Sequence, residues 1–451
     1  MSTAKHGLAV IHGHFYQPPR ENPWTGQVDA EASAAPEHDW NARITKETYR
    51  PLVPLYAYLS FDFGPTLLDW MEREARDVHD AIIRADRASA TRLGHGNALA
   101  MPYHHIILPL ASRRDKQTEV RWGMRDFGRR FGRAPVGFWL PETAVDRETL
   151  EVIAAEGIAF TVVAPHQVSK APNGGRPARI KLGGGRSIAV FAYNGELSHG
   201  VAFGGLQTDP DRWAQVMEQT AAGGGTSGGT MASIAVDGET FGHHHKGADR
   251  TVATVLHRLE HSPRVSLTNF AAALAASPPT ETTDVIEPSS WSCAHGVERW
   301  RSYCGCRMHG DTQQEWRAPL RAAVDWLAAE IHGIYEREGA GLRGGPWAFR
   351  DAAGATGPVD GGEDETANRL IEMERGALSA MTSCAWFFDD FAGLEGRQIL
   401  RYAAYAIGLA GHESARLEAG FIDKLGAARS NNPKAGTAVD VFRQFLQPTP
   451  S

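Results

Sequence analysis

The sequence has few cysteines, no long apolar run and no excess of basic residues, and each shortage excludes a class of protein. Four cysteines in 451 residues are too few for a disulfide scaffold. No stretch reaches the roughly 20 apolar residues that a membrane helix needs. Acidic residues outnumber basic residues by 53 to 46, so the net charge is −7. We therefore expect no nucleic-acid partner and no membrane partner.

The N-terminal segment, residues 1–13, contains only a short apolar run at residues 8–11. This run is too short for the core of a signal peptide, and no cleavage site of small residues follows it. With 42% hydrophobic and 22% charged residues, the composition is that of a globular protein. The sequence therefore predicts a soluble, cytoplasmic protein.

Short apolar runs recur in the first part of the chain, and segments with helical periodicity separate several of them. The runs cover residues 8–11, 59–63, 136–140, 160–164, 188–193 and 233–236, and the clearest helical segments cover residues 147–156 and 211–222. Runs without clean alternation are typical of buried parallel strands in an α/β fold. Polar residues follow several runs, at the strand ends where barrel enzymes carry their active sites. We therefore favour an α/β barrel over a doubly wound sheet.

The composition changes after Pro278 and Pro279, which mark a boundary. Residues 313–338, 365–391 and 397–424 show helical periodicity with Ala, Leu and charged faces, and no strand pattern competes there. We therefore predict two domains, a barrel over residues 1–285 and an all-α helical domain over residues 286–451.

Acidic residues follow two of the apolar runs and are the strongest candidates for catalysis. Glu142 follows a run that ends in Trp139, Leu140 and Pro141. Asp237 and Glu239 follow residues 233–236, and we expect one of them to point into the site and the other to support the loop. Position alone leaves open whether Glu142 is catalytic or only an acidic residue at the start of a helix.

His12 and His14 flank Gly13 after the first run and share one face of an extended strand. Such a pair can bind a metal ion or hydrogen-bond hydroxyl groups, and both roles stay open. The chain also has 12 tryptophans, which can stack on flat apolar ligands such as sugars or fill a core. Further donors and acceptors are Gln17, Asn97, His105 and His243.

A group of possible zinc ligands follows the boundary, namely Cys293, His295, Cys304 and Cys306. The one-residue gaps within this group are shorter than the two to four residues usual between zinc ligands. Reduced thiols without a metal ion are therefore the favoured interpretation, and we expect no cofactor.

Together these segments resemble glycoside hydrolase family 57, whose five short regions are matched in order. The matching segments are His12-Gly13-His14-Phe15-Tyr16-Gln17-Pro18, Gly94-His95-Gly96-Asn97-Ala98-Leu99, Trp139-Leu140-Pro141-Glu142, Asp237-Gly238-Glu239-Thr240-Phe241-Gly242 and Leu267-Thr268-Asn269-Phe270. The chain departs from the family pattern where Phe15 and Tyr16 extend the first region, and where three histidines (243–245) follow the fourth. The resemblance covers residues 1–285, and the remainder resembles a helical domain of unassigned role found on one branch of the family.

The resemblance implies a distorted (β/α)7 barrel that acts on α-glucans with retention of anomeric configuration, as an α-amylase, a 4-α-glucanotransferase or a branching enzyme. It implies that Glu142 is the nucleophile and Asp237 the general acid/base. The residues expected to bind an α-glucan or oligosaccharide substrate are His12, His14, Gln17, Asn97, His105, Trp139, Glu239, His243 and Trp291.

Two alternatives stay open at this point. A metal-dependent amidohydrolase or polysaccharide deacetylase would use the His12 and His14 pair, with His104, His105 and Asp237, to hold Zn²⁺. A carbohydrate-binding protein without catalysis is the other alternative, and the presence of both candidate acids argues against it.

Overall fold

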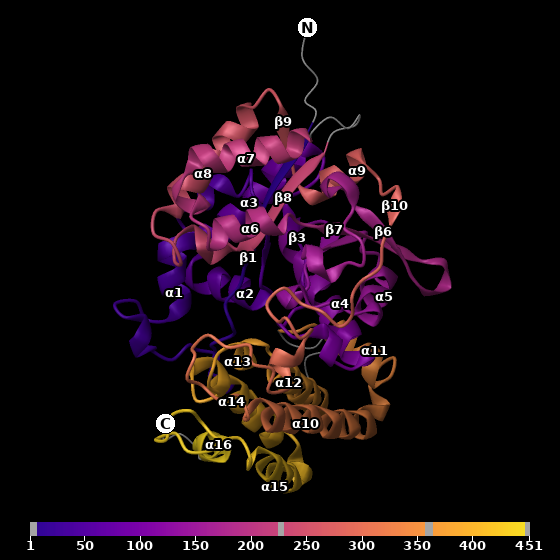
Figure 1. Cartoon of the computed structure of the whole chain (residues 1–451). Helices are drawn as coiled ribbons and strands as arrows, with labels where there is room; N and C mark the ends of the chain where they lie inside the picture. Colours follow the sequence, from indigo (N-terminus) through magenta and orange to yellow (C-terminus); the bar gives the residue numbers. More distant parts are fainter. Residues whose placement is uncertain (1–6, 224–229, 357–363, 447–451) are drawn as a thin grey trace. The chain divides into compact units, whose positions relative to one another are not determined.

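The computed structural model describes residues 7–223, 230–356 and 364–446 (Figure 1). The chain forms two compact units, and the first contains the described parts of residues 1–17, 30–101 and 126–291. The second contains residues 18–29, 102–125 and the described parts of 292–451. Two early segments thus belong with the C-terminal helices, whereas the sequence pattern assigns them to the barrel. The sequence pattern of these two segments does not show that they belong to the second unit. The domain boundary at 285/286 stays a prediction.

Among the described residues, seven parallel strands of the first unit form a closed ring. They are β1 (Gly7–Phe15), β2 (Ser60–Phe63), β3 (Ala98–Leu99), β4 (Gly137–Phe138), β5 (Phe160–Val163), β7 (Ser187–Ala192) and β8 (Met231–Asp237). The strands pair in this order, and β1 lies between β2 and β8. A bridge from Ala100 to Phe138 joins β3 to β4, and the Asn194 N–H donates to the Ser233 carbonyl (2.8 Å) where β7 meets β8. The expected (β/α)7 barrel is confirmed.

Three further strands lie outside this ring, namely β6 (Ala178–Lys181), β9 (Val265–Leu267) and β10 (Glu281–Thr282). The helices of this part of the chain are α1 (Trp40–Ile44), α2 (Pro65–Glu74), α3 (Arg76–Leu93), α4 (Arg113–Phe131), α5 (Arg147–Ala155), α6 (Gly195–Ala202), α7 (Pro210–Ala222), α8 (Ala248–His261) and α9 (Phe270–Ala276). Helices α6 and α7 pack on β8, and Figure 1 shows α8 beside them.

Alternate strand residues fill the centre of the ring, because successive side chains of a strand point to opposite faces. The buried cluster includes Val10 of β1, Val162 of β5, Phe191 of β7 and Ala235 of β8. The same face continues toward the carboxyl ends of the strands, where the side chains become polar. That continuation carries His12, His14, Asp62, Tyr193 and Asp237.

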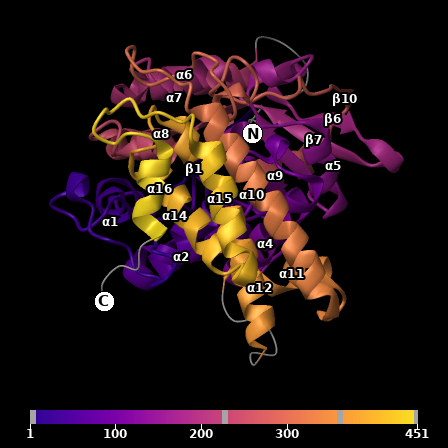
Figure 2. The same ribbon diagram turned by 90° about the horizontal axis from the view of Figure 1, so that it is seen from below.

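The second unit is mainly helical. Its helices are α10 (Arg317–Glu338), α11 (Pro346–Ala353), α12 (Glu365–Ser379), α13 (Cys384–Phe387), α14 (Leu394–Gly408), α15 (Ser414–Leu425) and α16 (Ala438–Leu446). Helix α10 packs on α12 and α15, and α14 packs on α12 and α16 (Figure 2). Two of the expected long helices are interrupted, one between α12 and α13 and one at Gly411, which has a φ of +61°. Every helix in the described part of the chain is too short or too polar to span a lipid bilayer.

A cluster of buried charges ties α10, α11 and α12 together. The guanidinium of Arg350 is fully buried, 2.6 Å from Glu374 Oε2 and 3.0 Å from Asp115 Oδ1. The ring of His332 lies 3.0 Å and 3.1 Å from the same two carboxylates. Burial alone lowers the pKa of His332, but Glu374 and Asp115 raise it to about 10. Two cations therefore face two anions inside this unit.

Candidate active site

A histidine pair and an aspartate form the base of the candidate site. His12 and His14 lie on the inward face of β1, and Asp62 lies on the neighbouring strand β2. His12 Nε2 is 3.0 Å from Asp62 Oδ1, and His14 Nδ1 is 2.7 Å from Asp62 Oδ2. His12 Nδ1 is also 3.0 Å from the hydroxyl of Ser60. The buried carboxylate thus holds both rings in fixed orientations.

The two histidines differ in their protonation. Burial lowers the pKa of His12, and the hydrogen bond to Asp62 does not fully offset this effect. Burial acts in the same direction on His14, but Asp62, with the charges of Asp237 and Glu239, raises the pKa of His14 to about 9. Burial alone raises the pKa of Asp62, yet the two histidines lower it overall. At neutral pH the group therefore contains an ionised Asp62, a neutral His12 and a protonated His14.

Asp237 and Glu239 occupy different positions at the end of β8. Asp237 is partnered with His14 in the β1–β8 pairing, and its side chain is exposed to solvent. The surrounding protein nevertheless raises the pKa of Asp237, and the charge of Asp62 adds to this effect. Glu239 is buried and accepts a hydrogen bond from the hydroxyl of Tyr49. Burial and the charge of Asp237 raise the pKa of Glu239 to about 7.

Glu142 has an unusual backbone conformation. It follows β4 in a short turn, η5 (Pro141–Thr143), with φ 58° and ψ 19°. Thr143 also has a positive φ, of 49°, and among the described residues these two are the only non-glycine residues in that region. Each such residue costs roughly 1–3 kcal/mol unless its surroundings enforce the conformation. Strain of this kind is concentrated at functional sites.

Gln167 holds this strained turn in place. Its fully buried side chain accepts a hydrogen bond from Thr143 Oγ1 (2.8 Å) and donates one to the Thr143 carbonyl (2.8 Å). The same amide accepts from the backbone N–H of Ala164 (2.8 Å), which anchors the turn to the end of β5. The position of Glu142 is therefore fixed by hydrogen bonds to its neighbour.

Trp291 fixes the carboxylate of Glu142 directly. The indole Nε1–H donates to Glu142 Oε2 (3.0 Å), and the backbone N–H of Trp291 donates to the Glu142 carbonyl (3.0 Å). Hydrogen bonds from a donor to a carboxylate are about twice as strong as neutral ones. Both the backbone and the side chain of Glu142 are thus held.

Aromatic rings connect Glu142 with the end of β8. Trp139 stacks on His14 with a centroid distance of 5.2 Å, and its edge meets Trp291 at 5.3 Å. Tyr193 lies 6.5 Å from Trp291, and burial followed by the charge of Asp237 raises the pKa of Tyr193. These ring contacts link Trp291, which holds Glu142, to His14, the partner of Asp237 in the β1–β8 pairing.

Phe15 requires one glycine within β1 and another directly after β8. A Cβ at Gly238 would lie 2.1 Å from the Phe15 ring, and one at Gly13 would lie 2.7 Å from it. The ring is fully buried and stacks on Phe63 at 4.6 Å. Phe15, which extends the first family region, thus belongs to the core below Asp237.

The remaining predicted site residues have other partners. Gln17 donates to the Tyr16 carbonyl (2.8 Å) and also hydrogen-bonds Tyr49, the partner of Glu239, whereas His243 pairs with Glu47 at 2.5 Å. Asn97 directly precedes β3, where its side chain donates to the Tyr56 carbonyl (2.9 Å) and accepts from Asn269 (2.9 Å), and its carbonyl accepts from the hydroxyl of Ser60 (3.4 Å). His105 belongs to the second unit and lies 2.7 Å from the hydroxyl of Ser383. A substrate-binding role for Asn97 and His105 stays a prediction.

Sequence reasoning missed Asp62, Gln167 and Tyr49 as parts of the site. Asp62 carries a detectable signal, since it is the one charged residue in the apolar strand Ser60–Phe63. Gln167 and Tyr49 act through contacts between distant segments, which no local pattern reveals.

The strand ends do not form the metal site that the alternative function requires. His12 and His14 direct ring nitrogens at Asp62 in hydrogen bonds, and His104 and His105 belong to the second unit. In the part of the chain that the structure describes, one group of side chains converges as metal ligands would, and it consists of Cys293, His295, Cys304 and Cys306.

A family model described as "Glycosyl hydrolase family 57" matches residues 24–282, more than half of the chain. A second, described as "Domain of unknown function (DUF3536)", matches residues 313–356 and 352–450. No curated protein matches the chain.

Several solved structures have a similar fold. An exo-type maltose-forming amylase from Pyrococcus sp. ST04 has a TM-score of 0.74 at 14% identity, over 96% of this chain and 90% of that chain. A branching enzyme from Thermococcus kodakaraensis has a TM-score of 0.64 at 16% identity, over 97% and 94%. An α-amylase from Thermotoga maritima has a TM-score of 0.62 at 13% identity, over 98% and 100%. At these identities the likeness shows the fold.

Proposed function

This chain belongs to glycosyl hydrolase family 57, and on that premise we propose that it cleaves α-glucosidic bonds of an α-glucan with retention of anomeric configuration. Enzymes with a similar fold include a maltose-forming amylase and a branching enzyme, which supports an α-glucan or oligosaccharide as the substrate class. A cytoplasmic location stays a prediction.

The observation that carries this proposal is the fixed, strained position of Glu142. The backbone of Glu142 is held at a positive φ. The hydrogen bond from Trp291 holds one carboxylate oxygen, so the carboxylate has little freedom to rotate. A nucleophile benefits from this arrangement, because the reacting atoms must be held close and aligned. Residues that only begin a helix do not need a costly backbone conformation.

In the first step the Glu142 carboxylate attacks the anomeric carbon from the face opposite the leaving group. Asp237 gives its proton to the glycosidic oxygen as the bond from carbon to oxygen breaks. The raised pKa of Asp237 suits this role, because the acid must keep its proton near neutral pH. A retaining enzyme places the two carboxyl groups about 5–5.5 Å apart, and we expect that separation here.

In the second step the Asp237 carboxylate removes a proton from a water molecule or a sugar hydroxyl. The resulting oxygen attacks the anomeric carbon and displaces Glu142, which regenerates both groups. Water as acceptor gives hydrolysis, and a sugar hydroxyl gives transfer. The proposal covers both outcomes because they share the glycosyl-enzyme intermediate.

We assign Trp291 and His14 to contact with the sugar between the two acids, and the fully buried Trp139 to supporting both rings. His12 is fully buried against Asp62, so we assign it to positioning His14 rather than to touching substrate. Glu239 is buried against Tyr49, and we assign it to helping Asp62 raise the pKa of His14. Gln17 and His243 are assigned to more distant parts of the bound glucan.

Replacing each acid tests these roles. Glu142→Gln should remain folded and lose turnover of maltooligosaccharides by more than a thousandfold, while Glu365→Gln on the exposed start of α12 should leave turnover unchanged. Retained turnover in Glu142→Gln would remove the nucleophile assignment.

Azide rescue distinguishes the two acids by stereochemistry. With an α-maltosyl fluoride donor, azide should replace the missing nucleophile in Glu142→Ala and give the β-glycosyl azide. In Asp237→Ala, azide should attack the covalent intermediate and give the α-glycosyl azide. Proton NMR of the anomeric hydrogen separates the products, and the opposite assignment of anomers would overturn the proposed roles.

A further inference from the structure

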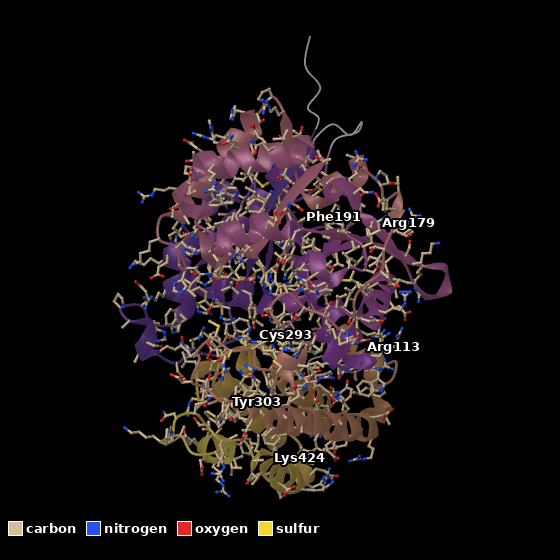
Figure 3. All side chains as sticks on the ribbon, in the orientation of Figure 1. Arg113, Arg179, Phe191, Cys293, Tyr303 and Lys424 are labelled. Carbon is tan, nitrogen blue, oxygen red and sulfur yellow. The ribbon has the colours of Figure 1, made fainter. Side chains whose placement is uncertain are left out.

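The segment before α10 has little regular structure of its own. Over residues 292–316, all of them described, a single short turn, η11 (Glu298–Trp300), is the only helix or strand. Loops of this length without secondary structure are uncommon in compact domains unless they have a function. Figure 3 labels Cys293 and Tyr303 within this segment.

Four side chains of this segment converge on one point. The donor atoms of Cys293, His295, Cys304 and Cys306 all lie within 4.8 Å of one another. Cys306 Sγ is 3.8 Å from Cys293 Sγ and 3.6 Å from His295 Nδ1, and Cys293 Sγ is 4.0 Å from Cys304 Sγ. These sulfur atoms are about twice as far apart as the ~2.05 Å of a disulfide.

The distances match the edges of a zinc tetrahedron. With Zn–S bonds of about 2.3 Å and Zn–N bonds of about 2.0–2.1 Å, tetrahedral angles give S–S edges of about 3.8 Å and S–N edges of about 3.6 Å. The observed separations of 3.8, 4.0 and 3.6 Å agree with these values to within a few tenths of an ångström. Four ligands also complete the coordination, as in structural rather than catalytic zinc sites.

The backbone around the ligands is held by Gln314. Gly305 stands between two of the cysteines with a φ of +90°, a conformation that favours glycine. The N–H of Gly305 donates to Gln314 Oε1 (3.2 Å), and Gln314 Nε2 donates to the Cys306 carbonyl (2.9 Å). Gln314 is fully buried. Such supporting hydrogen bonds orient the ligands of metal sites.

A buried positive charge lies beside the cluster. Arg317, the first residue of α10, is fully buried and donates from Nη1 to the Cys306 carbonyl (2.9 Å). Its Nε and Nη2 have no hydrogen-bond partner among the described residues, and Arg299 adds a second positive charge nearby. Buried cations need compensating anions. Asp389 supplies one negative charge near Arg317, and one Zn²⁺ with three thiolates carries a net charge of −1, which supplies a second.

We propose that Cys293, His295, Cys304 and Cys306 bind one Zn²⁺ ion in a structural site that fixes the segment before α10. The one-residue gaps between these ligands do not predict a zinc site from the sequence. The fold nevertheless brings the four side chains together. Each bound ion displaces the protons of three thiols, so binding weakens as pH falls.

Metal analysis of the full chain tests the proposal. The protein is purified under reducing conditions and its zinc content is measured by mass spectrometry. We expect about one zinc per chain in the wild type and in Cys384→Ser, a matched control in α13 outside the cluster. We expect zinc to be lost in Cys306→Ser and Cys304→Ser. Equal zinc in the control and the two cluster variants, or a disulfide among the cluster cysteines, would overturn the proposal.

Cobalt substitution gives an independent readout on the wild-type chain. Co²⁺ in place of zinc should show intense thiolate charge-transfer absorption in the near ultraviolet and visible bands of tetrahedral geometry. Gln314→Ala should weaken metal binding by about 10- to 100-fold while keeping the same spectrum. If the serine variants do not fold, removal of zinc by a chelator must lower the wild-type Tm, and returned zinc must restore it. An unchanged Tm, or no cobalt spectrum, refutes the site.

Discussion

Replacing Trp291 by Phe removes one hydrogen bond from the proposed nucleophile and keeps an aromatic ring. The indole Nε1–H donates to Glu142 Oε2 at 3.0 Å, and Phe has no group in that place. The main-chain hydrogen bond between the same residues is unaffected by the substitution. The experiment therefore isolates the side-chain contact that orients the carboxylate.

The expected effect follows from the strength of that contact. A hydrogen bond to a charged group contributes about 1.5–3 kcal/mol, and each 1.36 kcal/mol is a tenfold change in rate. We therefore expect kcat/KM to fall by about 10- to 150-fold. The loss should appear in kcat, because the bond orients the nucleophile for attack and a Phe ring can still stack on the sugar. Initial rates on an α-maltosyl fluoride give both constants.

Two controls separate the loss of the Trp291–Glu142 hydrogen bond from the effect of a smaller ring. Trp213→Phe removes a buried indole N–H that has no hydrogen-bond partner among the described residues, so it reports the cost of a smaller ring alone. In a Glu142→Gln background, Trp291→Phe should have much less effect, since the two residues act as a pair. A kcat/KM within threefold of wild type for Trp291→Phe, or an equal loss in both backgrounds, would refute the reasoning.

Three further predictions concern charged groups. Asp237→Asn removes a negative charge that helps to raise the pKa of Glu239 to about 7, so the Glu239 carboxyl should titrate at lower pH in carbon-13 NMR; an unmoved titration would contradict the coupling. Because the folded pKa of His14 is raised from 6.5 to about 9, its share of stability is complete below pH 6.5 and is lost as pH rises through about 9. Asp62→Asn should abolish this loss, which is on the order of 3 kcal/mol, as urea unfolding at pH 6 and pH 9.5 would reveal, and an unchanged pH dependence would argue against the pairing. Arg350→Met leaves His332 as the one cation facing two buried carboxylates and should lower the free energy of unfolding by about 3–5 kcal/mol, whereas a loss under about 1 kcal/mol in urea titrations would show that this ion pair is dispensable.

The barrel was predictable because its longer strands are continuous apolar runs. All six expected runs coincide with strands, among them β1 and β8, although β4 is shorter than its run. β3 was missed because it has only two residues and offers no periodicity. The expected helix over residues 365–391 is in fact two helices, since a pattern of apolar residues does not register a turn at residues 380–383. Elements that are very short, or that are broken by a turn, are therefore not predicted from apolar periodicity.

The sequence predicted the site residues at the strand ends, but it did not predict the residues that hold them in place. His14 and Asp237 follow apolar runs and prove to be partners across β1 and β8. Asn97 also belongs to a polar motif, but it stands before its strand rather than after it, and its role in the site stays a prediction. The left-handed backbone of Glu142 depends on the hydrogen bond between Thr143 and Gln167. These two residues are 24 positions apart in the sequence, and no local pattern predicts that they meet.

The packing of Phe15 between Gly13 and Gly238 constrains how this chain can change over time. A side chain at either glycine would overlap the aromatic ring, so such a mutation is accessible only after position 15 has become small. The order of substitutions is thereby fixed, and positions 225 residues apart along the chain must evolve as a unit. In directed evolution from this sequence, a side chain could be introduced at Gly238, beside Asp237, only after Phe15 has been replaced by a smaller residue.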